Sequence, residues 1–180
     1  MLNLVLYQPD IPQNFGACLR LSACLGATIH VIEPCGFVFD DAKLRRAGMD
    51  YIAKASYIRH LNWAAFLDHR HHVASHGAPR SGGGLGVIPP SASKIDHRQD
   101  HPGRLLLLET DGATRYTDIA YQRSDYIVLG RESAGTPREL YDQMDLTLTI
   151  PMCEGVRSLN VAMSAGMITA EACRQQEWRW

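Results

Sequence analysis

The sequence predicts an α/β fold, with a mostly parallel sheet and helices on both of its faces. Three short apolar runs, at residues 104–109, 126–129 and 146–150, have the continuous hydrophobicity typical of strands buried on both faces of a parallel sheet. The chain also opens with a strand-like run, a helical pattern and a second strand-like run. That order favours a parallel pair of strands joined by a crossover helix.

Length and composition fit one ordinary globular domain. The chain has 180 residues, of which 46% are hydrophobic and 21% charged. A chain of this size hides roughly 70% of its unfolded surface on folding, so it needs neither a disulfide nor a metal to hold it together. We therefore expect residues 1–180 to form a single domain.

The five cysteines form an odd set without a C-x-x-C pair, and several stand in apolar contexts, so we expect them to be reduced and mostly buried. The first residues carry no positive charge ahead of their short apolar run, and nowhere do eighteen apolar residues follow one another. These observations predict a cytoplasmic protein with no membrane contact.

The overall charge argues against a strongly cationic nucleic-acid binder, since the formal net charge is -1 and the sequence pI is near 6.7. The basic cluster at residues 43–46 could still form a local positive patch. A run of charges is, however, more often a solvated face.

The first third of the chain is a strand, a helix and a second strand. Residues 2–7 form an aliphatic strand-like run, and two prolines keep the loop after it extended. A helical stripe begins at residue 13 or 14, and Gly26 stands where a glycine ends a helix. The second strand is predicted at residues 28–33.

Arg20 lies at the edge of the apolar face of this first helix, between Leu19 and Leu21. An arginine in that position either extends its apolar stem over the surface or is held for a specific purpose. By itself the first outcome is the more common one.

The middle of the chain has weaker patterns. We predict a short basic helix at residues 42–48, a strand at 55–59 and a helix at 62–68. Residues 69–103 are rich in histidine and glycine and have little periodicity, which indicates a mobile insertion or a functional loop. The glycines there follow no strand and open no helix, so a dinucleotide-binding fingerprint is disfavoured.

Four histidines in this stretch raise the question of a metal site. They are His69, His71, His72 and His76. No cysteine and no pair of carboxylates stands near them, apart from the single Asp68, so the set is a poor match to a zinc site. The sequence predicts no metal.

The three buried strands each finish in a turn that contains glycine or proline. Because the carboxyl ends of parallel strands meet at one edge of a sheet, these turns should form one rim with a ligand crevice. The rim residues are Thr110-Asp111-Gly112, Gly130-Arg131-Glu132 and Pro151-Met152. A flavodoxin-like nucleotide-binding domain would also have such a crevice.

The segment after the last strand combines a strand end with a helix start. Pro151 ends the strand, Glu154-Gly155 makes a turn, and Ser158 is the predicted N-cap. Residues 160–174 then form a helix whose many small residues allow close approach of another backbone.

Arg157, Ser158 and Asn160 stand where unpaired backbone N–H groups face the crevice. That is a ligand position. On the residues alone, a capping serine beside a solvated arginine and a helical asparagine is the more common arrangement.

Three separated segments resemble, in order and spacing, the signature motifs of the SPOUT superfamily of RNA 2′-O-methyltransferases. Within it they are most similar to the small, single-domain tRNA methyltransferases that modify the wobble nucleotide, cytidine or uridine 34. The segments are PDIPQNFGACLRLSACLGATIHVIEP, GRESAGTP and IPMCEGVRSLNVAMSAGMITAEACR. The phrase IEPCGFVFDDAKLRRAGMDY is also like theirs.

This resemblance implies a trefoil knot at the C-terminal end, with S-adenosylmethionine bound in the knot mainly by backbone groups. It also implies a homodimer, in which Arg20 of one subunit faces the cofactor held by its partner. Matched motif to motif, the cofactor-binding residues are Leu108, Gly130, Ile150, Ser158 and Leu159.

The resemblance places catalysis at Arg20. Some members of the family use this arginine as a base, but a guanidinium stays charged in proteins. We therefore expect Arg20 to clamp a phosphate of the RNA and to stabilise the incipient alkoxide. The supporting catalytic residues are Asn14, Glu132, Ser158 and Asn160. The candidate RNA-binding residues are Lys43, Arg45, Arg46, Arg131 and Arg157.

The chain departs from the wobble enzymes at two places. The connection at residues 69–103 is longer, and the second motif reads GRESAG where those enzymes have proline before the glutamate and threonine-arginine after it. A methyltransferase for ribosomal RNA or another tRNA position, and a non-catalytic knotted RNA-binding factor, are the alternatives.

Overall fold

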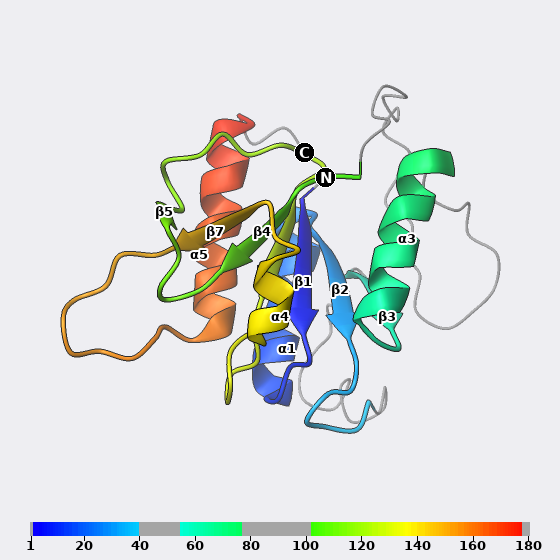
Figure 1. Cartoon of the computed structure of the whole chain (residues 1–180), viewed down its shortest axis with the longest axis horizontal. Helices are drawn as coiled ribbons and strands as arrows, with labels where there is room; N and C mark the ends of the chain where they lie inside the picture. The colour runs from blue at the N-terminus through cyan, green and yellow to red at the C-terminus, as the bar shows by residue number, and fades with distance from the viewer. Residues whose placement is uncertain (1, 40–54, 77–101, 178–180) are drawn as a thin grey trace.

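The structure is a computed structural model, which describes residues 2–39, 55–76 and 102–177, and it confirms the α/β fold. Within these ranges one sheet has the strand order β3-β2-β1-β6-β4-β7-β5, and all of its neighbouring strands are parallel (Figure 1). The strands are β1 (Asn3–Tyr7), β2 (Thr28–Ile32), β3 (Ser56–His60), β4 (Leu105–Leu108), β5 (Thr114–Arg115), β6 (Tyr126–Leu129) and β7 (Leu146–Thr149). The helices are α1 (Pro12–Leu25), α3 (Trp63–His76), α4 (Arg138–Tyr141) and α5 (Val161–Gln175).

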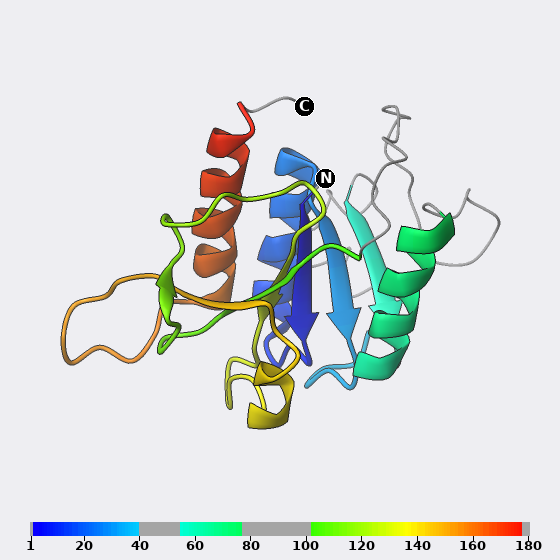
Figure 2. The same ribbon diagram turned by 45° about the horizontal axis from the view of Figure 1, so that its top comes forward.

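Helices cover both faces of the sheet, as predicted (Figure 2). Successive residues of a strand point to opposite faces, and β1 shows the consequence. Leu4 joins one apolar cluster with Phe15 of α1 and Ile168 of α5, whereas Val5 joins a second cluster with Phe66 of α3. The sheet is thus buried on both sides, which explains the continuous apolar runs of β4 and β6.

The first crossover forms as the sequence predicts, because β1 and β2 pair in parallel on either side of α1. Pro12 opens α1, where its missing N–H costs nothing. Gly26 ends the helix with φ +71°, and its N–H donates to the carbonyl of Ser22 at 2.8 Å. The helix therefore begins one or two residues before the predicted start, and β2 stops at Ile32, one residue before the predicted end.

The predicted boundary of the histidine-rich irregular stretch is wrong. Helix α3 continues through residues 69–76 instead of ending at Asp68. No glycine or proline interrupts the chain before Gly77, and the docked residue Phe66 fixes the helix against β2 and β3. Residues 77–101 and the predicted basic helix at 42–48 lie outside the described residues.

The second half of the chain adds two short elements. Strand β5 was not predicted, because two residues are too few to show any periodicity, and within the described ranges it pairs with β7 alone. Helix α4 begins at Arg138 directly after Pro137, as predicted, but it has only four residues. Strands β4 and β7 are each trimmed by one or two residues relative to the predicted runs.

All five cysteines are free, but the prediction that most of them are buried is wrong. Cys18 is buried, whereas Cys24 and Cys153 are exposed and the other two are partly covered. Cys24 lies on the exposed face of α1, away from the apolar face of the helix. No helix in the described part of the chain is long and apolar enough to cross a membrane.

Candidate functional site

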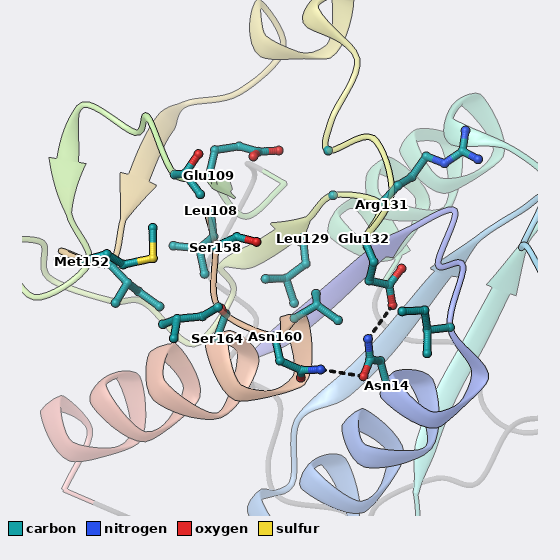
Figure 3. A pocket seen from close by; sticks show the side chains of 17 residues that line it. Asn14, Leu108, Glu109, Leu129, Arg131, Glu132, Met152, Ser158, Asn160 and Ser164 are labelled. Carbon is teal, nitrogen blue, oxygen red and sulfur yellow. Dashed lines mark hydrogen bonds between the residues drawn. The ribbon is translucent and has the colours of Figure 1, made fainter. Parts of the chain in front are cut away.

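The carboxyl ends of β4, β6 and β7 surround a cavity of about 490 Å³, at the rim that the sequence predicts. Segments far apart in the chain meet around it (Figure 3). The lining residues are Ile11, Asn14, Leu108, Glu109, Thr110, Leu129, Gly130, Arg131, Glu132, Gly135, Ile150, Met152, Ser158, Leu159, Asn160, Val161 and Ser164. A volume of this size is typical of a small-molecule site.

The turn after β6 can line the cavity only because two of its residues are glycines. A Cβ on Gly130 would lie 2.5 Å from Oγ1 of Thr136 and 2.8 Å from the backbone carbon of Gly135. Gly135 itself has φ +67°, a conformation that L side chains rarely adopt. The turn therefore folds tightly on itself, and paired hydrogen bonds between Arg131 and Gly135, of 3.2 and 2.8 Å, close it.

A chain of hydrogen bonds runs along one side of the cavity and joins three separate segments (Figure 3). Nδ2 of Asn160 donates to Oδ1 of Asn14 at 2.8 Å. Nδ2 of Asn14 donates in turn to Oε1 of Glu132 at 3.1 Å. The other carboxylate oxygen of Glu132 accepts the backbone N–H of Asp10 at 2.8 Å. The start of α5, the first turn of α1 and the turn after β6 are thereby held in register.

Asn160 also caps α5, which corrects the prediction that Ser158 is the N-cap. Its Oδ1 accepts the backbone N–H groups of Ala162 at 2.9 Å and Met163 at 3.2 Å. The amide suits both tasks, because its oxygen caps the helix while its nitrogen donates to Asn14. Ser158 lies two residues earlier and lines the cavity instead.

Asp10 ties the loop after β1 to the same turn. Ser133 donates to its carboxylate through both the backbone N–H, at 3.1 Å, and the hydroxyl. The guanidinium of Arg131 lies 3.4 Å from the other carboxylate oxygen. Hydrogen bonds from Ser133 and the charge of Arg131 lower the pKa of Asp10, so this carboxylate stays ionised.

The structure brings most of the predicted site residues together. Among the predicted catalytic and cofactor-binding residues, those that line the cavity are Asn14, Glu132, Ser158, Asn160, Leu108, Gly130, Ile150 and Leu159. Arg20 does not: it lies on α1 with an exposed side chain, outside the cavity lining of its own subunit.

The predicted RNA-binding residues separate into three groups. Arg131 lines the cavity and contacts Asp10, while Arg157 is exposed in the loop before α5. Lys43, Arg45 and Arg46 lie outside the described residues. The structure therefore gives Arg131 a local partner and leaves RNA contact by the set as a prediction.

Six lining residues were not among the predicted site or rim residues: Ile11, Glu109, Leu129, Gly135, Val161 and Ser164. Glu109 directly follows the last buried residue of β4, a position where a polar side chain faces the rim, and that placement was the available signal. Ile11 and Ser164 have no such signal, because their side chains reach the cavity only through the packing of α1 beside α5.

The chemistry of the lining favours orientation of a polar ligand over covalent catalysis. Burial raises the pKa of the nearby Cys18 thiol to about 12, and the charge of Glu132 adds to the effect, so a thiolate nucleophile is disfavoured. In the described ranges no group of three or more histidines, cysteines or carboxylates is placed to hold a metal ion. The cavity offers carboxylates, amides and hydroxyls beside an apolar wall.

Helices α1 and α5 lie side by side, and α5 and the loop before it carry exposed apolar side chains (Figure 2 shows the two helices). Met163 and Met167 of α5 are 62% and 37% exposed, and Val156 in the preceding loop is 57% exposed. Exposed apolar side chains of this size are typical of surfaces that take part in association.

Comparison with known proteins gives a consistent result. The chain matches the model of the SpoU rRNA methylase family over residues 1–79 and 91–170. It is 41% identical to the tRNA (cytidine(34)-2′-O)-methyltransferase of Ancylobacter novellus, over 97% of this chain and 92% of the relative. It is 34% identical to the enzyme of the same name from Escherichia coli strain K12, over 97% of this chain and 94% of the relative.

Solved structures agree. A structure described as giving insights into the 2-OH methylation of C/U34 on tRNA superposes with a TM-score of 0.76 at 35% identity, covering 99% of this chain and 98% of the other. The SpoU methyltransferase AviRb from Streptomyces viridochromogenes, in complex with AdoMet, gives a TM-score of 0.76 at 22% identity, over 97% of this chain and 57% of that one. At 22% identity, the likeness to AviRb shows a shared fold.

Proposed function

This chain belongs to the SpoU rRNA methylase family, and we propose on that basis that it transfers a methyl group from S-adenosylmethionine to the ribose 2′-hydroxyl of the tRNA wobble nucleotide, C34 or U34. One observation carries the proposal. Relatives that match nearly the full chain, at 34% to 41% identity, are tRNA (cytidine(34)-2′-O)-methyltransferases. A tRNA substrate implies that the protein acts in the cytoplasm.

The cavity suits the cofactor in size and in chemistry. Leu108, Ile150 and Leu159 form an apolar wall that fits an adenine ring. Gly130 lets the turn fold tightly at the edge of the cavity and contributes backbone to its lining, and Ser158 adds a hydroxyl. When bound, S-adenosylmethionine supplies an electrophilic methyl carbon on a sulfonium sulfur.

The residues of the chain contribute by positioning. An in-line methyl transfer depends on holding the attacking oxygen in place, and hydrogen-bonded side chains can do this at little cost in reorganisation. Asn14 and Glu132 form a fixed polar edge of the cavity, and Asn160 braces them from α5. These groups orient the ribose and limit its approach to one direction.

Arg20 completes the site from the second subunit of a homodimer. Its side chain is exposed on α1, which packs beside α5 with its exposed Met163 and Met167, and association through these two helices would bring Arg20 to the partner's cavity. There the guanidinium clamps the phosphate next to the target ribose and stabilises the developing alkoxide. Burial of the exposed methionines favours the association.

The C-terminal part folds as a trefoil knot within a single domain. Two observations support this proposal. Strand β7 enters the sheet between β4 and β5. Helix α5 is then tied to the segment before β6, where Gln175 accepts the N–H of Tyr121 and donates to the carbonyl of Ile119, both at 2.9 Å.

RNA contact extends from the cavity over nearby basic side chains. The candidates are Lys43, Arg45, Arg46, Arg131 and Arg157. Replacing one of them should weaken RNA binding and reduce its dependence on salt concentration.

The test is transfer of labelled methyl from S-adenosylmethionine to total tRNA, followed by location of the label. Label on the 2′-hydroxyl of nucleotide 34, absent with Arg20→Ala, is the expected result. Label at another tRNA position, or on ribosomal RNA alone when that is supplied, would show that the enzyme methylates a different nucleotide from the one proposed. Tight cofactor binding or RNA binding with no label on any RNA would identify a non-catalytic factor.

A further inference from the structure

We infer that Glu109 binds the ribose hydroxyls of the cofactor and thereby connects cofactor binding to the turn that holds Glu132. This inference rests on the proposed function, because it concerns the same cavity. Glu109 follows β4 directly and lines the cavity, on the side away from Asn14 (Figure 3).

The carboxylate of Glu109 is held at one oxygen and available at the other. Its Oε1 accepts the backbone N–H of Thr136 at 3.0 Å. Among the described residues, no hydrogen bond reaches Oε2. By contrast, Glu132 has both oxygens occupied, by the N–H of Asp10 and by Nδ2 of Asn14. Of these two carboxylates in the cavity lining, Glu109 is therefore the one with acceptor capacity to offer a ligand.

Gly135 keeps this carboxylate accessible. A Cβ built there would lie 3.6 and 3.7 Å from the two carboxylate oxygens of Glu109, so any longer side chain would cover them. The turn instead passes beneath the carboxylate and leaves it open toward the cavity. Half-buried and fixed by Thr136, Glu109 is ordered before any ligand arrives, which reduces the entropy lost on binding.

The neighbouring residues select the ribose over the other polar parts of the cofactor. Leu108 immediately precedes Glu109, and the backbone N–H of Glu109 bonds to the carbonyl of Leu148 on β7 at 2.9 Å, close to Ile150. An adenine held against Leu108 and Ile150 would place its attached ribose next to Glu109. Two vicinal hydroxyls are donors that a carboxylate can accept together, and an acidic side chain at a strand end performs this task in other doubly wound sheets.

The first test uses ligands and needs no substitution. S-adenosylhomocysteine and its 2′,3′-dideoxy analogue are titrated into the wild-type protein by calorimetry. We expect the dideoxy analogue to bind about ten-fold more weakly, as for loss of hydrogen bonds to a charged group. Equal affinities would overturn the inference. Failure of the wild type to bind S-adenosylmethionine or S-adenosylhomocysteine would instead overturn the proposed function, and the inference with it.

The second test uses Glu109→Gln, with Asp111→Asn as the matched control. Asp111 is an exposed carboxylate near the same strand end, paired with Arg138 at 3.1 Å and absent from the cavity lining. We expect Glu109→Gln to weaken the binding of S-adenosylhomocysteine and of 5′-methylthioadenosine by a similar factor, about ten-fold. Binding of the dideoxy analogue should weaken by much less. Asp111→Asn should change none of them.

Methylthioadenosine decides which part of the cofactor is recognised, because it keeps the ribose hydroxyls and lacks the amino-acid moiety. If Glu109→Gln weakens S-adenosylhomocysteine but not methylthioadenosine, the carboxylate holds the ammonium group and the inference is wrong. Unchanged affinity for all three ligands would also contradict it. Thermal unfolding of the variant without ligand separates loss of contact from loss of fold.

Discussion

Two parts of the sheet hold polar side chains in opposite ways. At the carboxyl rim, Asn14 and Asn160 bond to each other across 146 residues of chain and face a cavity. On the other side of β1, His30 of β2 and His60 of β3 bond to each other across 30 residues and are closed off from solvent, at 2% and 5% exposure. Both pairs satisfy their hydrogen bonds, but only the first is open to a ligand.

The histidine pair belongs to an aromatic cluster. The two rings stack with their centroids 5.2 Å apart, and Phe66 of α3 contacts both edge-on at 5.5 and 5.4 Å. His69, also on α3, covers them at 5.6 and 5.1 Å. Polar groups packed in this way fix the position of α3 over the sheet, and we assign the cluster a structural role.

Burial and hydrogen bonding alone therefore do not mark a functional residue. What distinguishes the rim is that its hydrogen-bonded groups keep one side on a cavity where segments distant in sequence converge. Substitutions at the rim should therefore change activity more than stability. Substitutions in the histidine cluster should do the reverse.

The largest effect is expected for Glu132→Gln. A glutamine can accept only one of the two N–H groups that Glu132 accepts, and its NH₂ must face the other donor. Methyl transfer should fall about 100-fold, as when a preorganised polar contact is lost. The measurement is single-turnover methylation of tRNA, with the exposed Glu139→Gln as control. Full activity in the variant would show that the network is merely structural.

His60→Ala is expected to affect stability instead. The substitution leaves a buried nitrogen of His30 without its partner 2.9 Å away and opens a cavity, at a cost of about 2 to 4 kcal/mol in the free energy of unfolding. Urea denaturation measures the change, and the exposed His71→Ala should stay within about 0.5 kcal/mol of the wild type. A loss of turnover in folded His60→Ala would erase the distinction between the two regions.

Acid should weaken the histidine cluster in a defined pH window. Burial lowers the pKa of His60 to about 4, and burial with the neighbouring His60 and His69 holds the pKa of His30 well below the ordinary 6.5. The unfolded chain then binds more protons below pH 6.5, so this stability is complete above that pH and is lost as the pH falls toward 4.

The slope should reach about 1.4 kcal/mol per pH unit for each histidine, measured by urea denaturation from pH 7 to pH 4.5. His60→Gln should flatten the profile, whereas His71→Gln should not. A profile as steep in His60→Gln as in the wild type would mean that other groups cause the acid sensitivity.

The smallest effect on stability is expected for Asn160, whose two roles, capping α5 and donating to Asn14, can be separated by substitution. Asn160→Ala removes the cap of α5 and should cost about 1 kcal/mol, whereas Asn160→Asp keeps a capping oxygen and should cost only a few tenths. Both variants lose the amide that donates to Asn14, so both should lose activity. The same two substitutions at Asn62, whose side chain accepts the N–H of Ala65 at 2.9 Å, are the control for the effect of capping alone. Normal methylation by Asn160→Asp would show that the amide is dispensable.

Much of the fold follows from local pattern. The runs at β4 and β6 are recognisable as buried strands because both of their faces are apolar, whereas β7 alternates leucine with threonine and is only partly buried. Gly26, Pro137 and Pro151 mark boundaries since their backbone chemistry restricts what can follow. The same reasoning places the rim and most of the residues that line the cavity.

Residues that are neighbours in the chain were therefore enough to predict the parallel sheet, its rim and the family motifs. The folded protein was needed to show that Asn160, not Ser158, caps α5, that Glu109 faces the cavity, and that His30 meets His60 under α3. The two sets differ in the range of the forces involved. Hydrophobic periodicity and turn chemistry act within a few residues, whereas these contacts join side chains that become neighbours only after the sheet has formed.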